Sequence, residues 1–435
     1  MQTLKRLPIW GVYALLAYMP FHIFLSQWLS TWTGGLSAWK VGKDVLTMAL
    51  VLLGLVLVLA KRLSNKKLFL VLSAVSILYL ILHIGLYFIR QDTTQEVGAL
   101  ATVYNNRVLW YLLIGLAAAL IAPKEVNLGK LTRLVLVAST VVCLVGVAQY
   151  HLPKDIMTNF GYSVERGVKP AYFIDDKPDL PRIMSTLRDP NSLGAFLLLP
   201  ILLLVQRLLD KARKNQRMMN AGLLLLHGLT LFLTFSRGAW AAMAVSLAAL
   251  ALTRYRQELA SLLKKTWPWL ATGLVVLLGA VYILRDQYII QNIVYHSDES
   301  TTAELDSNEL HAAFIENGVK GATEEPLGHG PGTAGIVSIQ NTEGSLLTEN
   351  YFVQIAYEVG ILGLLLFVGI LIFIQKKLIT GPQSDLLIAL AASFWGFILM
   401  AMVSHLWTNE AVAVYWWLLS GVAIAHSLSQ KIKRA

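Results

Sequence analysis

Cysteine and charged residues are both scarce in this sequence. Its 435 residues include one cysteine, Cys143, which lies within an apolar run. A single thiol forms neither an intramolecular disulfide nor a thiolate metal centre, so both are excluded. Only 14% of the residues are charged and 56% are hydrophobic, whereas a soluble domain carries about a quarter charged residues. The composition therefore excludes an ordinary soluble domain.

Two sequence patterns are also missing. Segments of about ten residues with alternating polarity, which a membrane β-barrel requires, do not occur. There is no Gly-rich phosphate loop followed by lysine, and the loops on the predicted cytoplasmic side are too short to hold a nucleotide-binding domain. A β-barrel is therefore excluded, and ATP-driven transport is disfavoured.

Apolar runs of roughly 17 to 25 residues are abundant, and such runs cross a bilayer core of about 30 Å as helices. We predict an all-α, polytopic integral membrane protein of about 12 transmembrane helices, with residues 1–435 forming a single membrane domain. The first run is too long for a signal peptide and lacks a small-residue cleavage site, so it is kept as a helix. The predicted spans are residues 8–28, 44–60, 68–89, 107–122, 131–150, 193–209, 218–235, 238–253, 267–284, 351–375, 383–403 and 409–428.

Basic residues lie mostly on one side of these spans. That side carries 23 basic residues and four acids, whereas the opposite side carries 13 basic and 22 acidic residues. Because basic flanks stay in the cytoplasm, we expect both termini to be cytoplasmic. The same flanks account for the net charge of +10, so no nucleic-acid partner is expected.

Two long loops are predicted on the outer face, residues 151–192 and the larger 285–350. Within the spans, ionisable residues are rare. The main polar exceptions are His22, His83 and His227, which we interpret as packing residues. Because transporters usually carry ionisable groups at bilayer depth, this pattern disfavours transport. Polar residues gather instead in three clusters at the outer ends of the helices.

The first cluster, residues 181–192, directly precedes the span at 193–209. Asn191 is interpreted either as a helix cap or as a residue of the site. Arg182 and Arg188 are interpreted either as surface-loop residues or as ligands of an anion.

The second cluster, residues 234–240, joins two spans with almost no loop. Arg237 follows Ser236 and is therefore held at the outer membrane boundary, beside Trp240. One interpretation is an interface arginine that extends its charge into water. The other interpretation is that Arg237 binds an anionic partner. A guanidinium fork matches phosphate oxygens, so a diphosphate is a natural ligand for it.

The third cluster combines the glycine-rich segment 326–332, which contains His329, with the start of the span at 351–375. Its glycines either form turns or permit close backbone approach to a ligand. Glu349 is interpreted either as a carboxylate that stabilises the helix N-terminus by interacting with the helix dipole, or as a general base at the membrane surface. Glu358 lies deeper and needs a partner, such as Arg237 or His405. Two further residues of this cluster are Asn350 and Tyr351.

In this order, the three clusters resemble motifs of the bacterial O-antigen ligase and Wzy-type polysaccharide polymerase superfamily. Residues 182–196 look like its Pro-Asn-x-x-Gly motif, and residues 234–240 look like its Ser-Arg-Gly element. Residues 326–332 look like its Pro-x-Gly-x-Gly loop, and residues 350–363 resemble its Asn-x-(Tyr/Phe)…Glu-x-Gly-x-x-Gly helix start. The matches cover about residues 180–365.

This resemblance implies a GT-C-like membrane glycosyltransferase in the bacterial cytoplasmic (inner) membrane. Its donor would be a glycan on undecaprenyl diphosphate in the outer leaflet, and its acceptor a glycan, a lipid or the cell wall. The reaction would be inverting and would need no metal or other cofactor. Carried over by position, Arg237 would bind the diphosphate, assisted by Arg182 or Arg188. The resemblance does not decide between a ligase and a polymerase, because the two differ in acceptor rather than in donor chemistry.

The sequence departs from the family pattern at two positions. Ligases of the family typically carry histidine before the motif asparagine, where this chain has Glu349; many polymerase-like members carry an acidic residue there. A second arginine usually precedes the glycine loop, and the nearest equivalents here are His311 and Lys320. Two other function classes remain: a transporter or exporter of an anionic glycolipid or amphiphile, and a scaffold of a cell-envelope complex.

Overall fold

The computed structural model describes residues 2–61, 66–90, 92–174, 177–283, 307–341, 346–381 and 384–434. Nearly all of this part of the chain is helical. The sheet that it contains is one antiparallel hairpin of two strands, β1 (Tyr172–Ile174) and β2 (Lys177–Arg182). The predicted all-α class is confirmed.

The first half of the chain forms helices α1 (Gln2–Tyr18), η1 (Met19–Phe21), α2 (His22–Thr33), α3 (Leu36–Ala60), α4 (Lys66–Ile89), α5 (Gln95–Ile121), α6 (Leu128–His151), η2 (Ile156–Phe160) and α7 (Pro190–Leu209). The second half forms η3 (Lys211–Gln216), α8 (Arg217–Leu233), α9 (Arg237–Arg254), α10 (Arg256–Ile283), α12 (Ser307–Glu324), α13 (Gly335–Ser338), α14 (Tyr351–Thr380), α15 (Asp385–Met402), η5 (Leu406–Thr408), α16 (Glu410–Ala413), η6 (Val414–Leu418) and α17 (Leu419–Arg434).

Within the described ranges, 9 helical segments are long and apolar enough to cross a membrane, which makes this a multi-pass membrane protein. They are Lys5–Thr33, Leu36–Ala60, Lys66–Ile89, Gln95–Ile121, Leu128–His151, Pro190–Leu209, Tyr351–Thr380, Asp385–Met402 and Glu410–Gln430. The other three predicted spans fall on α8, α9 and α10. Helix α8 has 17 residues, fewer than the roughly 20 of a typical span, and α9 carries an arginine at each end.

Helix α5 forms the centre of the bundle and is buried along almost its whole length. It packs against α1, α3, α4 and α17. Where it crosses η6 and α17, a Cβ atom on Gly115 would collide with the backbone of Leu418, and one on Gly421 would collide with that of Leu112. Small residues of this kind let membrane helices approach closely, so this crossing depends on the two glycines.

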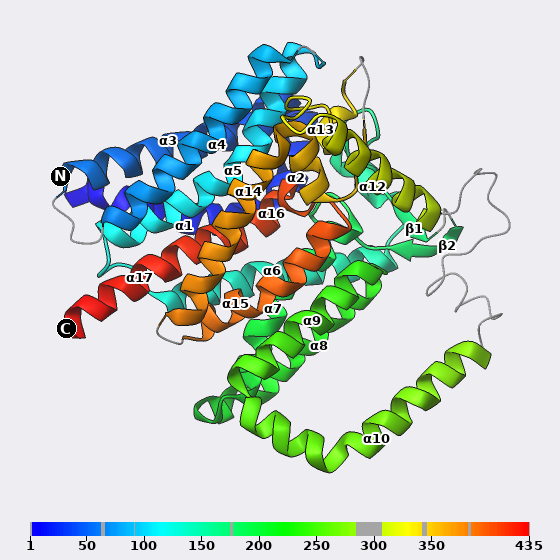
Figure 1. Cartoon of the computed structure of the whole chain (residues 1–435). Coiled ribbons are helices and arrows are strands. Elements are labelled where there is room, and N and C mark those ends of the chain that lie inside the picture. Colours follow the sequence, from blue (N-terminus) through cyan, green and yellow to red (C-terminus); the bar gives the residue numbers. More distant parts are fainter. Residues whose placement is uncertain are drawn as a thin grey trace.

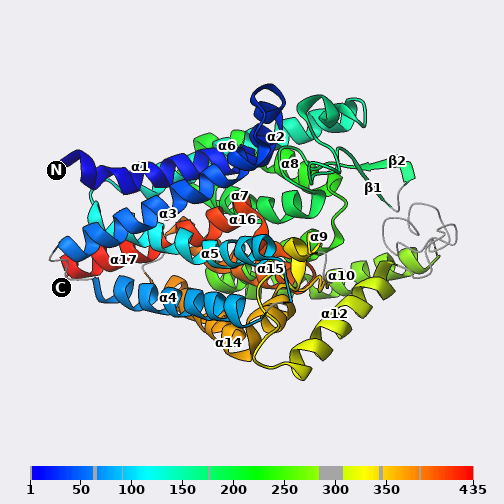
Figure 2. The same ribbon diagram turned by 90° about the horizontal axis from the view of Figure 1, so that it is seen from above.

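The two ends of the chain lie at one end of the bundle, whereas the β-hairpin, α12 and α13 lie at the other, which we call the loop end (Figures 1 and 2). Helix α10 extends away from the bundle beyond α9 (Figure 1). The predicted loop 285–350 contains two helices that the sequence did not predict, α12 and α13, and α12 packs along α14. The rest of that loop includes residues 285–306 and 342–345, which lie outside the described ranges.

Candidate functional site

The glycine-rich segment 326–332 docks onto a break in α14. Gly360 has a φ of 74° and interrupts the helix, which exposes backbone carbonyls to other partners. The backbone N–H of His329 donates to the Tyr357 carbonyl at 2.9 Å, and that of Gly330 donates to the Glu358 carbonyl at 3.0 Å. The glycines therefore serve close approach to another backbone segment, not only turn formation.

Glu358 holds this loop through its carboxylate. One oxygen accepts from the backbone N–H groups of Gly332 at 3.0 Å and Ala334 at 3.2 Å. The other accepts from Asn105 Nδ2 at 2.6 Å and more weakly from Gln354 Nε2 at 3.4 Å. These four partners are amide groups, in place of the direct pairing with Arg237 or His405 that the sequence led us to expect. The carboxylate positions the loop that carries α13.

His405 joins the same network one step further out. Its Nδ1 lies 2.8 Å from Gln354 Oε1, and the Gln354 amide nitrogen faces Glu358. Since an amide oxygen only accepts, Nδ1 carries the proton. Burial and the charge of Arg188 lower the pKa of His405 to about 3. The imidazole is therefore neutral at pH 7.

Each of the three clusters contains one non-glycine residue in the left-handed backbone region. These residues are Ser185 (φ 55°), Phe235 (φ 47°) and Glu349 (φ 46°). Such conformations carry a strain of order 1–3 kcal/mol and are concentrated at functional sites. In this chain they mark the loop-end positions that the sequence motifs selected.

Two adjoining hollows at the loop end share Arg188, Thr408 and Glu410, and we call them together the loop-end cavity. The first, of about 230 Å³, is also lined by Asn191, Glu349, His405 and Asn409. The second, of about 440 Å³, is also lined by Lys40, Lys43, Tyr104, Glu165 and Arg166. Ile336 of α13 and Ile339, directly after this helix, contact both hollows. Docking of the glycine loop thus supplies one wall of the cavity.

Four cationic side chains line this cavity: Lys40, Lys43, Arg166 and Arg188. Arg166 Nε donates to Gln27 Oε1 at 3.0 Å, and Lys40 Nζ donates to the Arg166 carbonyl at 2.9 Å. The half-buried Arg188 guanidinium has no hydrogen-bond or ion-pair partner among the described residues. An arginine in that setting is available to an anion that enters the cavity.

A buried ion-pair cluster forms the floor of the cavity. Glu410 Oε1 lies 2.9 Å from Arg107 Nη1 and 3.4 Å from Lys43 Nζ. Lys43 also contacts Asp44 Oδ2 at 2.9 Å. The Arg107 side chain is 0% exposed, donates to the Thr408 carbonyl and lies 3.9 Å above the Tyr104 ring. The helices are thus less free of ionisable groups than the sequence indicated.

Arg182 and Arg237 lie beside the cavity and not in its lining. Arg182 Nε donates to the Thr234 carbonyl at 3.0 Å, and its Nη2 donates to Asn191 Oδ1 at 2.9 Å. It therefore ties the first cluster to the second. Arg237 is half-buried and is the first residue of α9. Ser236 caps this helix by accepting a hydrogen bond from the backbone N–H of Ala239. The adjacent Gly238 faces Met400 and Val403, which line the cavity.

The remaining predicted residues have structural surroundings. Asn350 caps α14 by accepting from the N–H groups of Phe352 at 3.0 Å and Val353 at 3.1 Å. Tyr351 is buried against Phe367. His329 stacks on Tyr357 at 4.0 Å between ring centroids.

The two expected substitutes for a second family arginine do not line the cavity. Lys320 is exposed on α12, and the side chain of His311 lies outside the described part of the chain. Their place among the cavity cations is taken by Lys40, Lys43 and Arg166. Sequence reasoning missed these three, together with Arg107 and Glu410. The available signal for Lys40, Lys43, Arg107 and Glu410 was their position as charged residues at the outer edges of apolar runs, whereas Arg166 lies within the loop 151–192.

Over the described ranges, no group of three or more His, Cys, Asp or Glu side chains is placed to hold a metal ion.

Part of the chain matches a known protein-family model. Residues 222–368, about a third of the chain, match the Wzy_C family model, described as O-antigen ligase. This range contains the second and third clusters and ends beyond Glu358. No curated protein matches the chain. The match confirms the resemblance to the O-antigen ligase and Wzy-type superfamily, and it supports glycan transfer of the ligase or polymerase kind as the activity of this multi-pass membrane protein.

Proposed function

We propose that the chain transfers a glycan from undecaprenyl diphosphate to an acceptor hydroxyl, without a metal and with inversion at the anomeric carbon. The acceptor is a growing glycan, a lipid or the cell wall. The observation that carries the proposal is the loop-end cavity, in which the unpartnered Arg188 and the strained Glu349 line the same hollow. The family match supports the class of reaction.

The cavity cations suit the departure of a diphosphate. As the bond between the anomeric carbon and the phosphate oxygen breaks, negative charge grows on the leaving group. Fixed cations in a site of low dielectric stabilise that charge without reorganisation. Arg188 is the best placed ligand, with Lys40 and Arg166 beside it in the second hollow. Arg237, adjacent to the cavity, remains part of this proposal, whereas Arg182 orients Asn191.

Glu349 is the proposed general base. It would take the proton of the acceptor hydroxyl as the hydroxyl oxygen attacks the anomeric carbon, and a positioned base contributes roughly 10²–10⁴-fold. Glu410 lines both hollows and is held by Arg107 and Lys43. Its charge serves to place those cations, so Glu410 is not the proposed base.

We place the cavity at the outer face of the bacterial cytoplasmic membrane, with both ends of the chain in the cytoplasm. Two observations support this orientation. The ends of the chain lie at the opposite end of the bundle from the β-hairpin, α12 and α13 (Figure 2). The predicted cytoplasmic side also carries 23 basic residues and four acids, as the distribution of basic loops in membrane proteins requires.

The experiment is glycan transfer by the purified chain in liposomes that contain an undecaprenyl-diphosphate glycan and an acceptor, with EDTA present. We expect product in EDTA, and we expect Arg188→Ala to lower the rate at least about 100-fold. Lys154→Ala is the matched control, because that exposed cation lies outside the cavity. Wild-type rates in Arg188→Ala would refute the assigned role, and complete loss of activity in EDTA would refute metal independence.

A second candidate is export of an anionic amphiphile. The buried cluster of Lys43, Arg107 and Glu410 favours it, because ionisable groups inside a helix bundle often lie on transport paths. Proteoliposomes separate the two functions. Movement of an intact labelled glycolipid across the bilayer, with no bond broken, supports export, whereas a transferred glycan with the lipid diphosphate released supports the transferase.

A further inference from the structure

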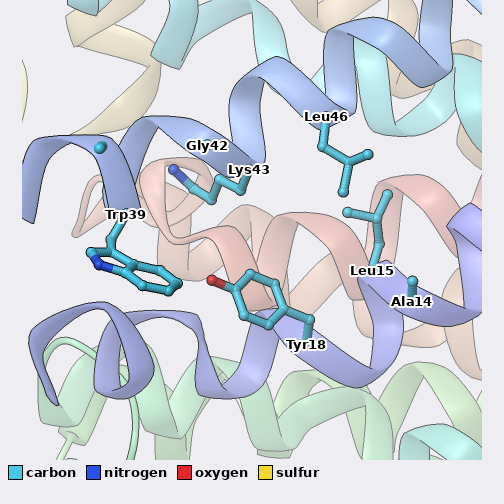
Figure 3. A pocket seen from close by; sticks show the side chains of 8 residues that line it. Ala14, Leu15, Tyr18, Trp39, Gly42, Lys43 and Leu46 are labelled. Atoms are coloured by element: carbon cyan, nitrogen blue, oxygen red, sulfur yellow. The ribbon is translucent and has the colours of Figure 1, made fainter. Parts of the chain in front are cut away.

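An apolar groove lies between α1 and α3, next to the loop-end cavity. It has a volume of about 560 Å³ and is lined mainly by Leu15, Tyr18, Trp39, Gly42, Lys43 and Leu46. Figure 3 shows the side chains of Tyr18, Trp39 and Lys43 facing the space between the two helices. The groove is separate from every residue that the sequence motifs selected.

The groove is open toward the lipid side of the bundle. Leu46 is 50% exposed and Trp39 is 37% exposed, and both belong to a membrane-spanning helix. A Cβ atom on Gly42 would have no heavy atom within 4 Å, so the space beside it is empty. From Trp39 to Leu46 the groove follows α3 for about 10 Å, given 1.5 Å per helical residue.

Lys43 connects the groove to the loop-end cavity, because its side chain lines both. Its ammonium group donates to the Lys40 carbonyl at 2.8 Å and pairs with Asp44 and Glu410. The apolar space therefore ends at a buried cation, beyond which Lys40, Arg166 and Arg188 line the polar hollow. Apolar walls that end at cations match a molecule with a hydrocarbon chain and an anionic head.

We propose that the prenyl chain of the donor lies in this groove, and that the donor reaches the cavity laterally between α1 and α3, with its diphosphate passing Lys43. This rests on the proposed function, since it takes the donor to be a lipid diphosphate. A phospholipid with a zwitterionic head would fill the apolar part, but its one phosphate charge is balanced by its own cation, so it would gain less from the cations than a diphosphate does.

The test fills the groove and varies the length of the lipid. Gly42→Phe places a ring in the empty space, and its helical backbone accepts a side chain because φ is not positive there. Gly85→Phe is the matched control, because Gly85 lies in α4 and a Cβ atom placed on it would likewise have no heavy atom within 4 Å. Binding of undecaprenyl diphosphate and of inorganic diphosphate, the short diphosphate that has no prenyl chain, is measured on the full chain, together with thermal unfolding.

We expect Gly42→Phe to weaken binding of the long lipid about tenfold, which corresponds to losing the burial of about two methylene groups, and to leave the short diphosphate unchanged. Gly85→Phe should change neither. Equal weakening for both lengths, no weakening for either, or displacement of the long lipid by excess phosphatidylcholine would overturn the proposal. Leu46→Trp gives a second variant if Gly42→Phe fails to fold. Binding without any glycan transfer in the wild type would refute the proposed function and leave the groove assignment standing.

Discussion

Removing the carboxylate of Glu410 should destabilise the whole bundle. Glu410 is the ion-pair partner of the Arg107 guanidinium, which is 0% exposed, and of the Lys43 ammonium, which is 2% exposed. Glu410→Ala leaves Arg107 buried with only the Thr408 carbonyl as a hydrogen-bond acceptor. Breaking a buried pair from one side reduces the free energy of unfolding by about 3–5 kcal/mol. At roughly 2 °C per kcal/mol, the melting temperature should fall by about 6–10 °C.

Thermal unfolding of the chain can be followed by the labelling of its own cysteine. Cys143 is its one cysteine and is buried in α6, so a thiol-reactive dye labels the protein only as it unfolds. The matched control is Glu125→Ala. Glu125 pairs with Arg6 at 2.7 Å, but the two side chains are 36% and 52% exposed, and such pairs contribute only about 0–1 kcal/mol.

A double variant distinguishes a lost ion pair from lost packing. Arg107→Leu combined with Glu410→Leu removes both charges, so it should recover a large part of the stability that Glu410→Ala loses. If Glu410→Ala melts within about 1–2 °C of the wild type, the shift expected from about 1 kcal/mol or less, the buried cluster does not hold the cavity floor as described. Refutation also follows if Glu125→Ala is equally destabilising.

Three further predictions concern the site. Glu349→Gln should lower the rate of glycan transfer about 10²–10⁴-fold while donor binding is kept, which rapid-quench and binding measurements check together; an unchanged rate would contradict the base assignment. Glu358→Gln should lower the free energy of unfolding of the docked loop by about 1.5–3 kcal/mol, because hydrogen bonds to a charged acceptor are replaced, and should speed proteolysis between residues 326 and 341; protection equal to that of the wild type would contradict it. His405 has a folded-state pKa of about 3, below its ordinary 6.5, so below pH 6.5 the unfolded chain binds a proton at this residue more readily than the folded chain does. The free energy of unfolding is therefore not reduced by His405 above pH 6.5, and it falls as the pH is lowered toward 3. The melting temperature should therefore fall less between pH 7 and pH 4.5 in His405→Gln than in the wild type, and parallel curves would show that His405 does not contribute.

The helical membrane fold could be predicted because it depends on local composition. A run of apolar residues long enough to cross a bilayer forms a helix wherever it lies in the chain, since the backbone has no other hydrogen-bond partners there. The loop helix α12 was missed for the opposite reason. Its sequence is polar, and its place is decided by packing on α14. The predictions for residues 151–192 and 285–350 as two outer-face loops remain predictions.

The motifs could be found in the sequence, but their roles could not. The segment 326–332 and Gly360 were visible as glycine signals, yet only the fold shows that one docks on the other. Glu358 was expected to pair with a cation, and the structure gives it four amide donors. A sequence shows that a buried carboxylate needs partners, and it does not show which backbone segment will supply them.

By itself, the sequence determined that this protein is a multi-pass helical membrane protein and that its polar motifs gather at the ends of particular helices. Hydrophobic run length and local motif spacing are properties of short segments, so they can be recognised without knowing the fold. Only the tertiary structure decided that Lys43 of α3, Arg107 of α5 and Glu410 of α16 meet beneath one cavity with Arg188 and Glu349. These residues are far apart in the chain, and their contacts depend on which helices pack together, which composition and spacing do not specify.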